Sequence, residues 1–520
     1  MSNLPSEIPN PKSEILNSQS AIRNPQSEIS FRPSRFSVTL TILLLAALLF
    51  PFLWKPWIHG NDGARHYAYC RSLCLDHDLD FTNEFEHYAR AGELEEIRVD
   101  ARTGRPGNSQ GIGSGLLWIP FFLVGHLMAW IAGAPADGYS APYVTMVCFG
   151  TTFYAMLGLA LLTRVLCWRF GSRAALVAVL AIWLGTPLAF YMYLHPSMSH
   201  GCSFFLSALL LWEYERWRNA PRPWHFLLMG LTAGLAVATR VNDGLLLLIP
   251  AAFWLRINCG LRIGDCGLKK REIEDGSPQS AIRNPQSENP QSPIRNPQSL
   301  PAAYSLQPTA YSLFSTGFLA LAGCLIGFFP QMLAWHAFYG AWLAGPRDYE
   351  LARNLSLLSS PHFLEVLFSG WRGLFVWSPV LLPAFVGLAI LARRRRLLDL
   401  VWFAAFLLQT WVIGGWATWY GGASFGQRFF INLLPGFALG LAWFYLRLRP
   451  GAPRKILVGA VVLAVLWNGG LAAQYVGNLI SRENRVTLTE ITRNQFTKAP
   501  RWVLEHLRLL RPGDRIQKRL

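Results

Sequence analysis

Residues 36–67 read FSVTLTILLLAALLFPFLWKPWIHGNDGARHY, an apolar run followed by a polar turn that carries Asp62. About 20 apolar residues cross the hydrocarbon core of a bilayer, roughly 30 Å thick, as one helix, and positions 36–54 meet this length. The run lies behind a polar leader and ends without a small-residue cleavage site, unlike a secretory signal peptide. We therefore expect it to remain in the protein as a membrane anchor.

Similar apolar runs recur along the chain, in which 52% of the residues are hydrophobic. Open sheets are excluded inside lipid, because the bilayer cannot satisfy the hydrogen bonds at their edges. The sequence therefore predicts an all-α polytopic membrane protein with about eleven transmembrane helices. These helices are expected near residues 36–54, 142–163, 174–194, 201–217, 224–241, 243–257, 313–338, 373–392, 398–417, 429–447 and 454–477.

A twelfth apolar run, at 112–133, decides the topology. Short loops rich in Lys and Arg favour the cytoplasmic side of a membrane. If 112–133 is a re-entrant or juxtamembrane helix instead of a span, the basic clusters between the other runs all lie in the cytoplasm. These clusters are found at 164–173, 216–222, 269–271, 393–396 and 447–455. We therefore place 112–133 in an extracytoplasmic first outer loop, 55–135, and we expect no nucleic-acid partner despite the net charge of +17.

The chain divides into five segments by composition. A low-complexity tail at 1–35 precedes an N-terminal membrane module at 36–257, and a second polar segment at 258–312 separates it from C-terminal membrane helices at 313–477. The tail and the polar segment share the hexapeptide IRNPQS, and their recurrent prolines argue against helix. Both are predicted to be disordered, with 258–312 in the cytoplasm, and 478–520 is predicted to be an amphipathic basic tail.

Ten of the thirty acidic residues lie between Lys55 and Gly111, and Asp62 has the most specific surroundings among them. Asp62 follows the first span, between Gly60 and Gly63, which we expect to form a flexible frame. The later acids include Asp-x-Asp-x-Asp at 76–80, which lacks the glycine and the terminal glutamate of a calcium-binding EF-hand loop. A solvated loop is expected there. No cofactor is predicted, and a divalent metal has no support from the residue spacing.

Other polar residues are predicted on the same outer face. His195 and His200 belong to HPSMSH, which joins two apolar runs, and either could be an ordinary loop residue. Arg240 ends an apolar run that carries Gly230 and Gly234 at small-xxx-small spacing. An ionisable residue at the end of a span indicates a functional site, although snorkelling to the interface is the alternative.

Residues 411–428 read WVIGGWATWYGGASFGQR, which combines aromatic residues, glycines and a terminal arginine at one membrane boundary. Trp419 and Tyr420 fit an interfacial aromatic belt, and their rings also offer faces on which a sugar could stack. Glycines allow close backbone approach to a ligand, and Arg428 offers a planar fork that binds phosphate. The combination indicates a ligand site more than an anchor alone.

Taken in order, these segments resemble the GT-C class of membrane glycosyltransferases, which contains the protein O-mannosyltransferases and the aminoarabinose transferases of lipid A. The resemblance implies a GT-C-like fold in a bacterial inner membrane. It also implies a polyprenyl-phosphate sugar donor, an extracytoplasmic lipid, glycan or protein acceptor, and inversion at the anomeric carbon. The matching segments are GNDGARHY at 60–67, GIGSGLLWIP at 111–120, GLAVATR at 234–240, FPQMLAW with Tyr339-Gly340 at 329–340, and WYGGASFGQR at 419–428.

The resemblance assigns the acid of the family's first loop to Asp62, as the base or the group that orients the acceptor hydroxyl. Arg240 and Arg428 are our candidates for holding the lipid phosphate. Relatives often have Asp-Glu where this chain has Asp62-Gly63, so the second acid is absent or is supplied by Asp76, Asp78 or Glu84. The predicted substrate-binding residues are Arg65, His66, Tyr67, Asp78, His195, His200, Arg240, Trp419, Tyr420, Gln427 and Arg428.

Two other functions are compatible with this composition. A transporter or flippase of lipid-linked sugars would share a basic, aromatic outer cavity, but the sequence lacks the mid-span charges and repeated halves typical of that class. A catalytically inactive membrane scaffold is the second alternative, and Gly63 in place of the second acid supports it.

Overall fold

A computed structural model describes residues 35–95, 97–258, 310–344 and 355–506. Except at their margins, the predicted disordered segments at 1–35 and 258–312, with their hexapeptide repeats, lie outside these ranges. Within these ranges the chain is helical, and extended pairing is limited to two isolated bridges, Val99 with Pro106 and Leu355 with Trp416. The prediction of an all-α fold is confirmed.

Several of the helices are extended or interrupted by π or 3-10 turns, labelled η. In chain order they are α1 (Arg35–Leu53), α2 (Gly60–Arg71), η2 (Ser72–Asp76), α3 (Thr82–Arg90), α4 (Gly113–Ile131), α5 (Ala141–Phe170), α6 (Ser172–Leu184), η3 (Phe190–Leu194), α7 (His200–Trp217), α8 (Pro223–Thr239), η4 (Val241–Leu247), α9 (Leu248–Asn258), α10 (Ala310–Tyr339), α12 (Phe363–Phe368), α13 (Leu374–Trp377), α14 (Leu381–Arg393), α15 (Leu397–Gly414), η5 (Arg428–Leu433), α16 (Leu434–Arg447), α17 (Ala452–Val476), α18 (Leu488–Phe496) and α19 (Lys498–His506).

Seven of the described helical segments are long and apolar enough to cross a membrane: α1, α4, α5, α10, α15, η5 with α16, and α17. The shorter helices α6, α8 and α14 are also apolar. A multi-pass membrane protein is therefore supported, whereas the number of about eleven spans stays a prediction. The helix α4 covers the run at 112–133 and is among the seven by length and composition, so its placement in the first outer loop also stays a prediction.

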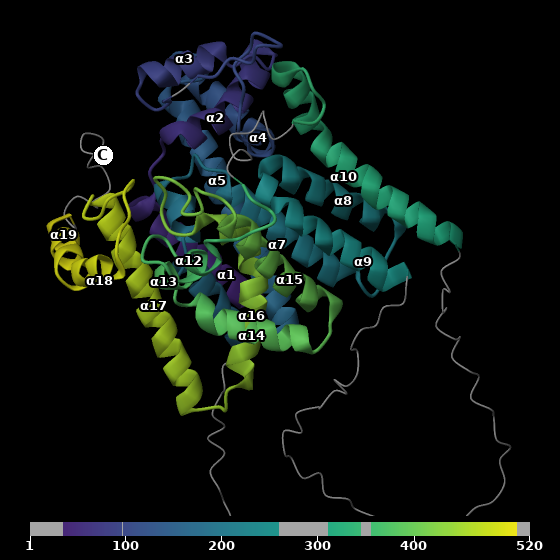
Figure 1. Ribbon diagram of the computed structural model, residues 1–520, viewed down its shortest axis with the longest axis vertical. Coiled ribbons are helices and arrows are strands. Elements are labelled where there is room, and N and C mark those ends of the chain that lie inside the picture. The colour runs from purple at the N-terminus through teal and green to yellow at the C-terminus, as the bar shows by residue number, and fades with distance from the viewer. Residues whose placement is uncertain (1–34, 96, 259–309, 345–354, 507–520) are drawn as a thin grey trace, which may run out of the picture.

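The first outer loop is itself folded. Figure 1 shows α2, α3 and α4 at one end of the molecule, with α8, α9 and α10 along one side and α17, α18 and α19 on the opposite side. Tyr67 of α2, Phe85 of α3, Trp118 of α4 and Phe338 of α10 belong to one buried apolar cluster. This cluster, separate from the larger core of the membrane helices, fixes α2 rigidly above them.

The membrane helices α8 and α10 pack with their backbones in contact. A Cβ added at Gly234 would lie 2.1 Å from the carbonyl oxygen of Cys324, and one at Gly323 would lie 2.0 Å from that of Leu227. Glycine on both helices therefore allows this approach, as the small-xxx-small spacing of Gly230 and Gly234 indicated. Because α8 is held in this way, the position of Arg240 just after its end is fixed as well.

A buried ion-pair cluster ties other helices together far from the first outer loop. Arg169, near the end of α5, lies 3.1 Å from Glu215 of α7 and 2.9 Å from Asp399 of α15. Breaking such a pair on one side leaves a buried charge uncompensated, which is costly. The cluster therefore fixes the register of α5, α7 and α15 at the end opposite to α2.

Candidate active site

Asp62 lies in the first turn of α2. The helix begins at Gly60, whose φ of +69° is a left-handed conformation that glycine adopts without strain. Glu93, which is 33 positions away in the chain, caps this helix end, because its Oε2 accepts a hydrogen bond of 2.6 Å from the backbone N–H of Gly60. An acidic residue in the first turn is also stabilised by the helix dipole. These contacts place the Asp62 carboxylate at a fixed helix end.

Two residues from distant parts of the chain bind the Asp62 carboxylate. Arg428, at the start of η5, donates from Nη1 to Oδ2 at 2.8 Å, and Gln110 donates from Nε2 to Oδ1 at 2.9 Å. The side chain of Asp62 is 27% exposed and that of Arg428 is 15% exposed. The pair is therefore half-buried, with the carboxylate still reachable from solvent.

The charges around Asp62 keep it ionised. Burial by itself would raise the pKa of Asp62, but the positive charge of Arg428, with smaller contributions from His66 and Arg240, outweighs it. The pKa of this carboxyl group therefore lies below its ordinary value of 3.8. A charged carboxylate at a site that ligands can reach is able to accept a proton or a hydrogen bond from a hydroxyl group.

Arg240 reaches the same site from the end of α8. Its Nη1 lies 3.1 Å from Oγ of Ser199 and 3.3 Å from both ring nitrogens of His200. The His200 ring is stacked on Tyr191, with centroids 4.2 Å apart. The buried Asp243 lies close enough to offset part of the positive charge of Arg240. The structure thus brings together Asp62, Arg240, His200 and Arg428, which the sequence spreads over four separate segments.

His66 lies one helical turn after Asp62, on the same face of α2. Its Nδ1 lies 2.9 Å from Oγ of Ser114 and 3.3 Å from the carbonyl oxygen of Gly111, whereas its buried Nε2 has no hydrogen-bond partner among the described residues. Burial lowers the pKa of His66 to about 4, so the ring is neutral at physiological pH. A neutral imidazole with a free nitrogen beside Asp62 is available to bind a polar group of a ligand.

Two other predicted residues of α2 point into the first outer loop instead. Arg65 donates from Nε to Oδ1 of Asn61 at 2.8 Å and from Nη1 to the carbonyl oxygen of Gly107 at 3.1 Å. Tyr67 is fully buried, and its hydroxyl donates to the carbonyl oxygen of Gly138. These contacts hold the loop together, and neither side chain makes a contact with Asp62 in the described part of the chain.

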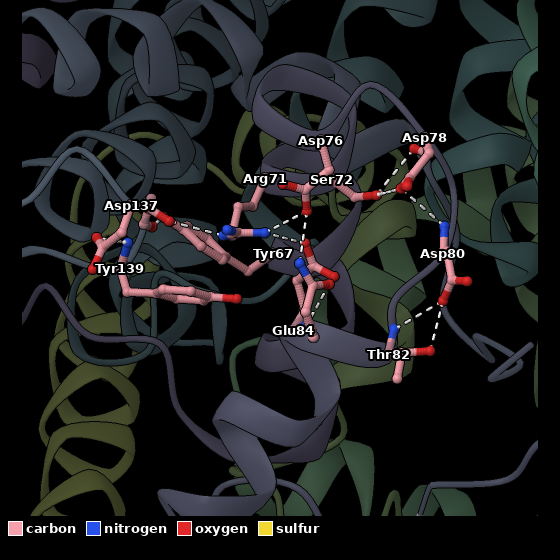
Figure 2. Close-up of polar contacts among 12 residues, drawn as sticks. Tyr67, Arg71, Ser72, Asp76, Asp78, Asp80, Thr82, Glu84, Asp137 and Tyr139 are labelled. Carbon is pink, nitrogen blue, oxygen red and sulfur yellow. Dashed lines mark hydrogen bonds and ion pairs between the residues drawn. The ribbon is translucent and has the colours of Figure 1, made fainter.

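The other acids of the first outer loop form a separate network (Figure 2). Arg71 lies 2.6 Å from Asp76 and 2.7 Å from Glu84, and the burial of Glu84 raises its pKa to about 7. Asp78 is exposed and accepts a hydrogen bond of 2.8 Å from the hydroxyl group of Ser72. None of these three acids contacts Asp62 within the described ranges, because Asp76 and Glu84 pair with Arg71 and Asp78 binds Ser72.

Gly63 is packed tightly inside α2 and is not part of a flexible frame. A Cβ at this position would lie 2.8 Å from Oγ of Ser197 and 3.3 Å from its Cβ. Ser197 belongs to the HPSMSH segment, in which His195 Nε2 also lies 3.1 Å from the carbonyl oxygen of His59. The place of a second acid next to Asp62 is therefore filled by the loop between η3 and α7.

The aromatic run at 411–428 lies beside the same site. Trp419 is buried, and its carbonyl oxygen accepts a hydrogen bond of 3.2 Å from Nε2 of Gln427. The Tyr420 ring is stacked on Trp371 with centroids 3.6 Å apart. The predicted aromatic residues are thus largely engaged with each other, and Gln427 directs the chain that presents Arg428.

Three residues of the site escaped the sequence analysis. Gln110 is uncharged and stands in a glycine-containing loop, where only its position just before an apolar run could have drawn attention. Ser197 had no signal of its own. Arg372 stands before a glycine within an apolar region of the sequence. Its side chain is 2% exposed and lies near Tyr420, and its Nη1 has no hydrogen-bond partner among the described residues. Among the described residues, no three His, Cys, Asp or Glu side chains gather as a metal site would require.

No protein-family model and no curated protein matches the chain. Among solved structures, ArnT from Cupriavidus metallidurans in the apo state matches with a TM-score of 0.45 and 15% identity, over 92% of this chain and 73% of that chain. Archaeal oligosaccharyltransferase AglB from Archaeoglobus fulgidus, in complex with an inhibitory peptide and a dolichol-phosphate, matches with a TM-score of 0.39 and 12% identity. This match covers 92% of this chain and 55% of that chain. The apo form of the Archaeoglobus fulgidus oligosaccharyltransferase matches with a TM-score of 0.39 and 13% identity, over 92% of this chain and 54% of that chain. The chain thus spans about half the length of the archaeal proteins.

Proposed function

We propose that the protein is an integral membrane glycosyltransferase. It moves a sugar from a polyprenyl-phosphate donor to an acceptor on the extracytoplasmic side, with inversion at the anomeric carbon. The observation that carries this proposal is the ionised Asp62 held between Arg428 and Gln110, with Arg240 close by. A carboxylate together with two cations in one half-buried site suits a reaction that accepts a proton and releases a phosphate.

In this reaction Arg240 and Arg428 bind the phosphate of the lipid donor. Arginine presents a planar fork of donors that matches phosphate oxygens, and its charge offsets the negative charge that grows as the sugar leaves. The Nε of Arg428 is buried without a partner among the described residues, so it has a donor to offer. Arg240 is held by Ser199 and His200 in a fixed orientation.

Asp62 accepts the proton of the acceptor hydroxyl or orients that hydroxyl for attack. In the free protein Arg428 depresses the pKa of Asp62, which makes the carboxylate a weak base. A donor phosphate competes with Asp62 for the guanidinium of Arg428, and the pKa of Asp62 then rises because the largest charge that opposes burial is engaged elsewhere. Donor binding thereby activates the base, so that the proton is taken only when a sugar is present.

The proposal includes a topology. About eleven helices span an inner membrane of bacterial type, and Asp62 lies on the extracytoplasmic face. The basic loops that follow α5, α7, α14 and α16 lie on the cytoplasmic face. The partners are the bilayer, the lipid-linked sugar and a lipid, glycan or protein acceptor.

The test uses the full chain in lipid nanodiscs with a panel of polyprenyl-phosphate sugars. A donor is identified by sugar-dependent thermal stabilisation, and transfer is then followed with that donor and extracted envelope acceptors. Asp62→Asn is expected to slow transfer by about 10²- to 10⁴-fold, because the loss of a general base has this effect. Glu86→Gln, on the exposed face of α3, is the matched control and should keep full activity.

Two results would contradict the proposal. If Asp62→Asn transferred sugar at the rate of the unchanged protein, Asp62 would not be the base. If no lipid-linked sugar raised the unfolding temperature and none was consumed, the scaffold alternative would be favoured over the enzyme.

A further inference from the structure

A solvent-open pocket lies next to the Asp62 site. Its cavity volume is about 40 Å³, and it lies between the segment after α1, the turn η3 and the end of α17. It is lined by Lys55, Trp57, His59, Phe190, Leu194, His195, Tyr475, Val476 and Arg482. Apart from His195, none of these residues was among the predicted substrate-binding residues.

Two cations face each other in this pocket without a carboxylate. Burial, and then the charge of Arg482, lower the pKa of Lys55, so the two side chains repel one another. Neither forms an ion pair with any residue that the structure describes. The Nε of Arg482 is buried without a hydrogen-bond partner there, while its Nη2 donates to the carbonyl oxygen of Tyr475 at 3.3 Å. Two uncompensated positive charges are unfavourable alone and favourable around an anion.

The other ionisable groups nearby do not neutralise these cations. Glu93 forms no ion pair with Lys55 or Arg482 in the described ranges, and its Oε2 lies instead 2.9 Å from Nδ1 of His59 and 2.6 Å from the N of Gly60. Burial lowers the pKa of His195 to about 4, so this ring is neutral at physiological pH. The pocket therefore keeps the positive charge of Lys55 and Arg482.

The pocket also offers aromatic faces and touches the proposed active site. The Trp57 ring is stacked on His59, with centroids 4.1 Å apart, and His59 immediately precedes the helix that carries Asp62. His195 lies between the two regions, because its Nε2 is 3.1 Å from the carbonyl oxygen of His59 and its ring lies near Asp62. A molecule bound in the pocket would therefore reach the surroundings of the Asp62 carboxylate.

We propose that this pocket binds an anionic group of the acceptor, a phosphate or phosphate-like group, and places the acceptor hydroxyl near Asp62. The inference rests on the proposed function, in which Arg240 and Arg428 hold the phosphate of the donor. Lys55 and Arg482 then form a second anion site, on the other side of His195. The protein selects acceptors that carry negative charge, and Trp57 provides a face for a neighbouring sugar ring.

The experiment measures the binding of inorganic phosphate and of undecaprenyl phosphate separately, by calorimetry on the full chain in detergent micelles. Lys55→Gln and Arg482→Gln should each weaken the binding of inorganic phosphate by roughly 10- to 100-fold, because each removes a charge-assisted hydrogen bond. Both variants should bind undecaprenyl phosphate like the unchanged protein. Arg485→Gln is the matched control, since Arg485 is 71% exposed and pairs with Glu365 outside the pocket.

The outcomes separate this inference from the proposed function. If inorganic phosphate does not bind, or binds equally well to both variants, the second anion site is wrong, and the effect of Asp62→Asn on transfer still decides the enzyme. If both variants lose undecaprenyl phosphate instead, the pocket holds the donor and the assignment to the acceptor is overturned.

Discussion

The packing of Gly63 against Ser197 gives the most direct test of the site geometry. A Cβ at position 63 would lie 2.8 Å from Oγ of Ser197 and 3.3 Å from its Cβ, and the first distance requires a shift. Such overpacking costs about 1–3 kcal/mol, whereas replacing glycine by alanine inside a helix gains about 1 kcal/mol. Gly63→Ala alone should therefore reduce the free energy of unfolding by about 1 kcal/mol.

The second step removes the obstacle. Ser197→Ala deletes Oγ and leaves the 3.3 Å contact with Cβ and an ordinary contact of 3.7 Å with the carbonyl oxygen. Its own effect should be small, because Oγ accepts only a long hydrogen bond of 3.4 Å from the N–H of His59. In this background Gly63→Ala should be neutral or stabilising, which gives a coupling free energy of about 1–2 kcal/mol between the two sites.

The four proteins are compared by equilibrium unfolding in mixed micelles of SDS and dodecyl maltoside. Gly459→Ala is the control, because a Cβ at Gly459 of α17 meets no atom within 4 Å and should not couple to Ser197. If Gly63→Ala were as mild as Gly459→Ala and showed no coupling, the space beside Asp62 would be open. A second acid at position 63 could then fit, contrary to the packing.

Three further predictions follow from the ion pair, the helix cap and the helix crossing. Arg428→Gln should slow transfer by about 100-fold and shift the acidic limb of the rate–pH profile upward, because burial raises the pKa of Asp62 and the largest opposing charge is then gone; an unshifted limb would refute this role. Burial raises the pKa of Glu93, but the hydrogen bonds with His59 and Gly60 lower it by more, so that it lies below the ordinary value of 4.5. The stabilisation that Glu93 provides is therefore present above pH 4.5 and is lost as the pH falls through the lower folded-state pKa. Glu93→Gln should remove this acid-dependent loss of unfolding free energy, and identical pH profiles would contradict it. Gly234→Leu should destabilise the protein by about 3 kcal/mol, because its Cβ would lie 2.1 Å from Cys324 O, and an unchanged SDS midpoint would show that α8 and α10 are not in backbone contact.

The sequence predicted the helical class because apolar runs of membrane length are a local property. It also showed Gly230 and Gly234 at the spacing of one helix face, which favours close packing, but only the structure identifies α10 as the partner of α8. The exact number of spans did not follow, because several runs are split by turns such as η3 and η4, whose positions depend on packing between helices.

Within the site, the sequence singled out Asp62 and Arg428, but only the tertiary structure brings them together. They are 366 positions apart, and their contact depends on the packing of α2 above η5. Arg65 and Tyr67 follow Asp62 closely in the chain and yet point elsewhere, because successive residues of a helix face different directions.

The same distinction applies to Gly63. The sequence alone determined that an acid stands at position 62 and that none follows it, since both are properties of residue identity. Only the tertiary structure shows what a larger residue at 63 would meet, because the Oγ of Ser197, from a distant loop, lies 2.8 Å from the position of its Cβ. Identity is local, whereas available volume is set by every segment that packs against the helix.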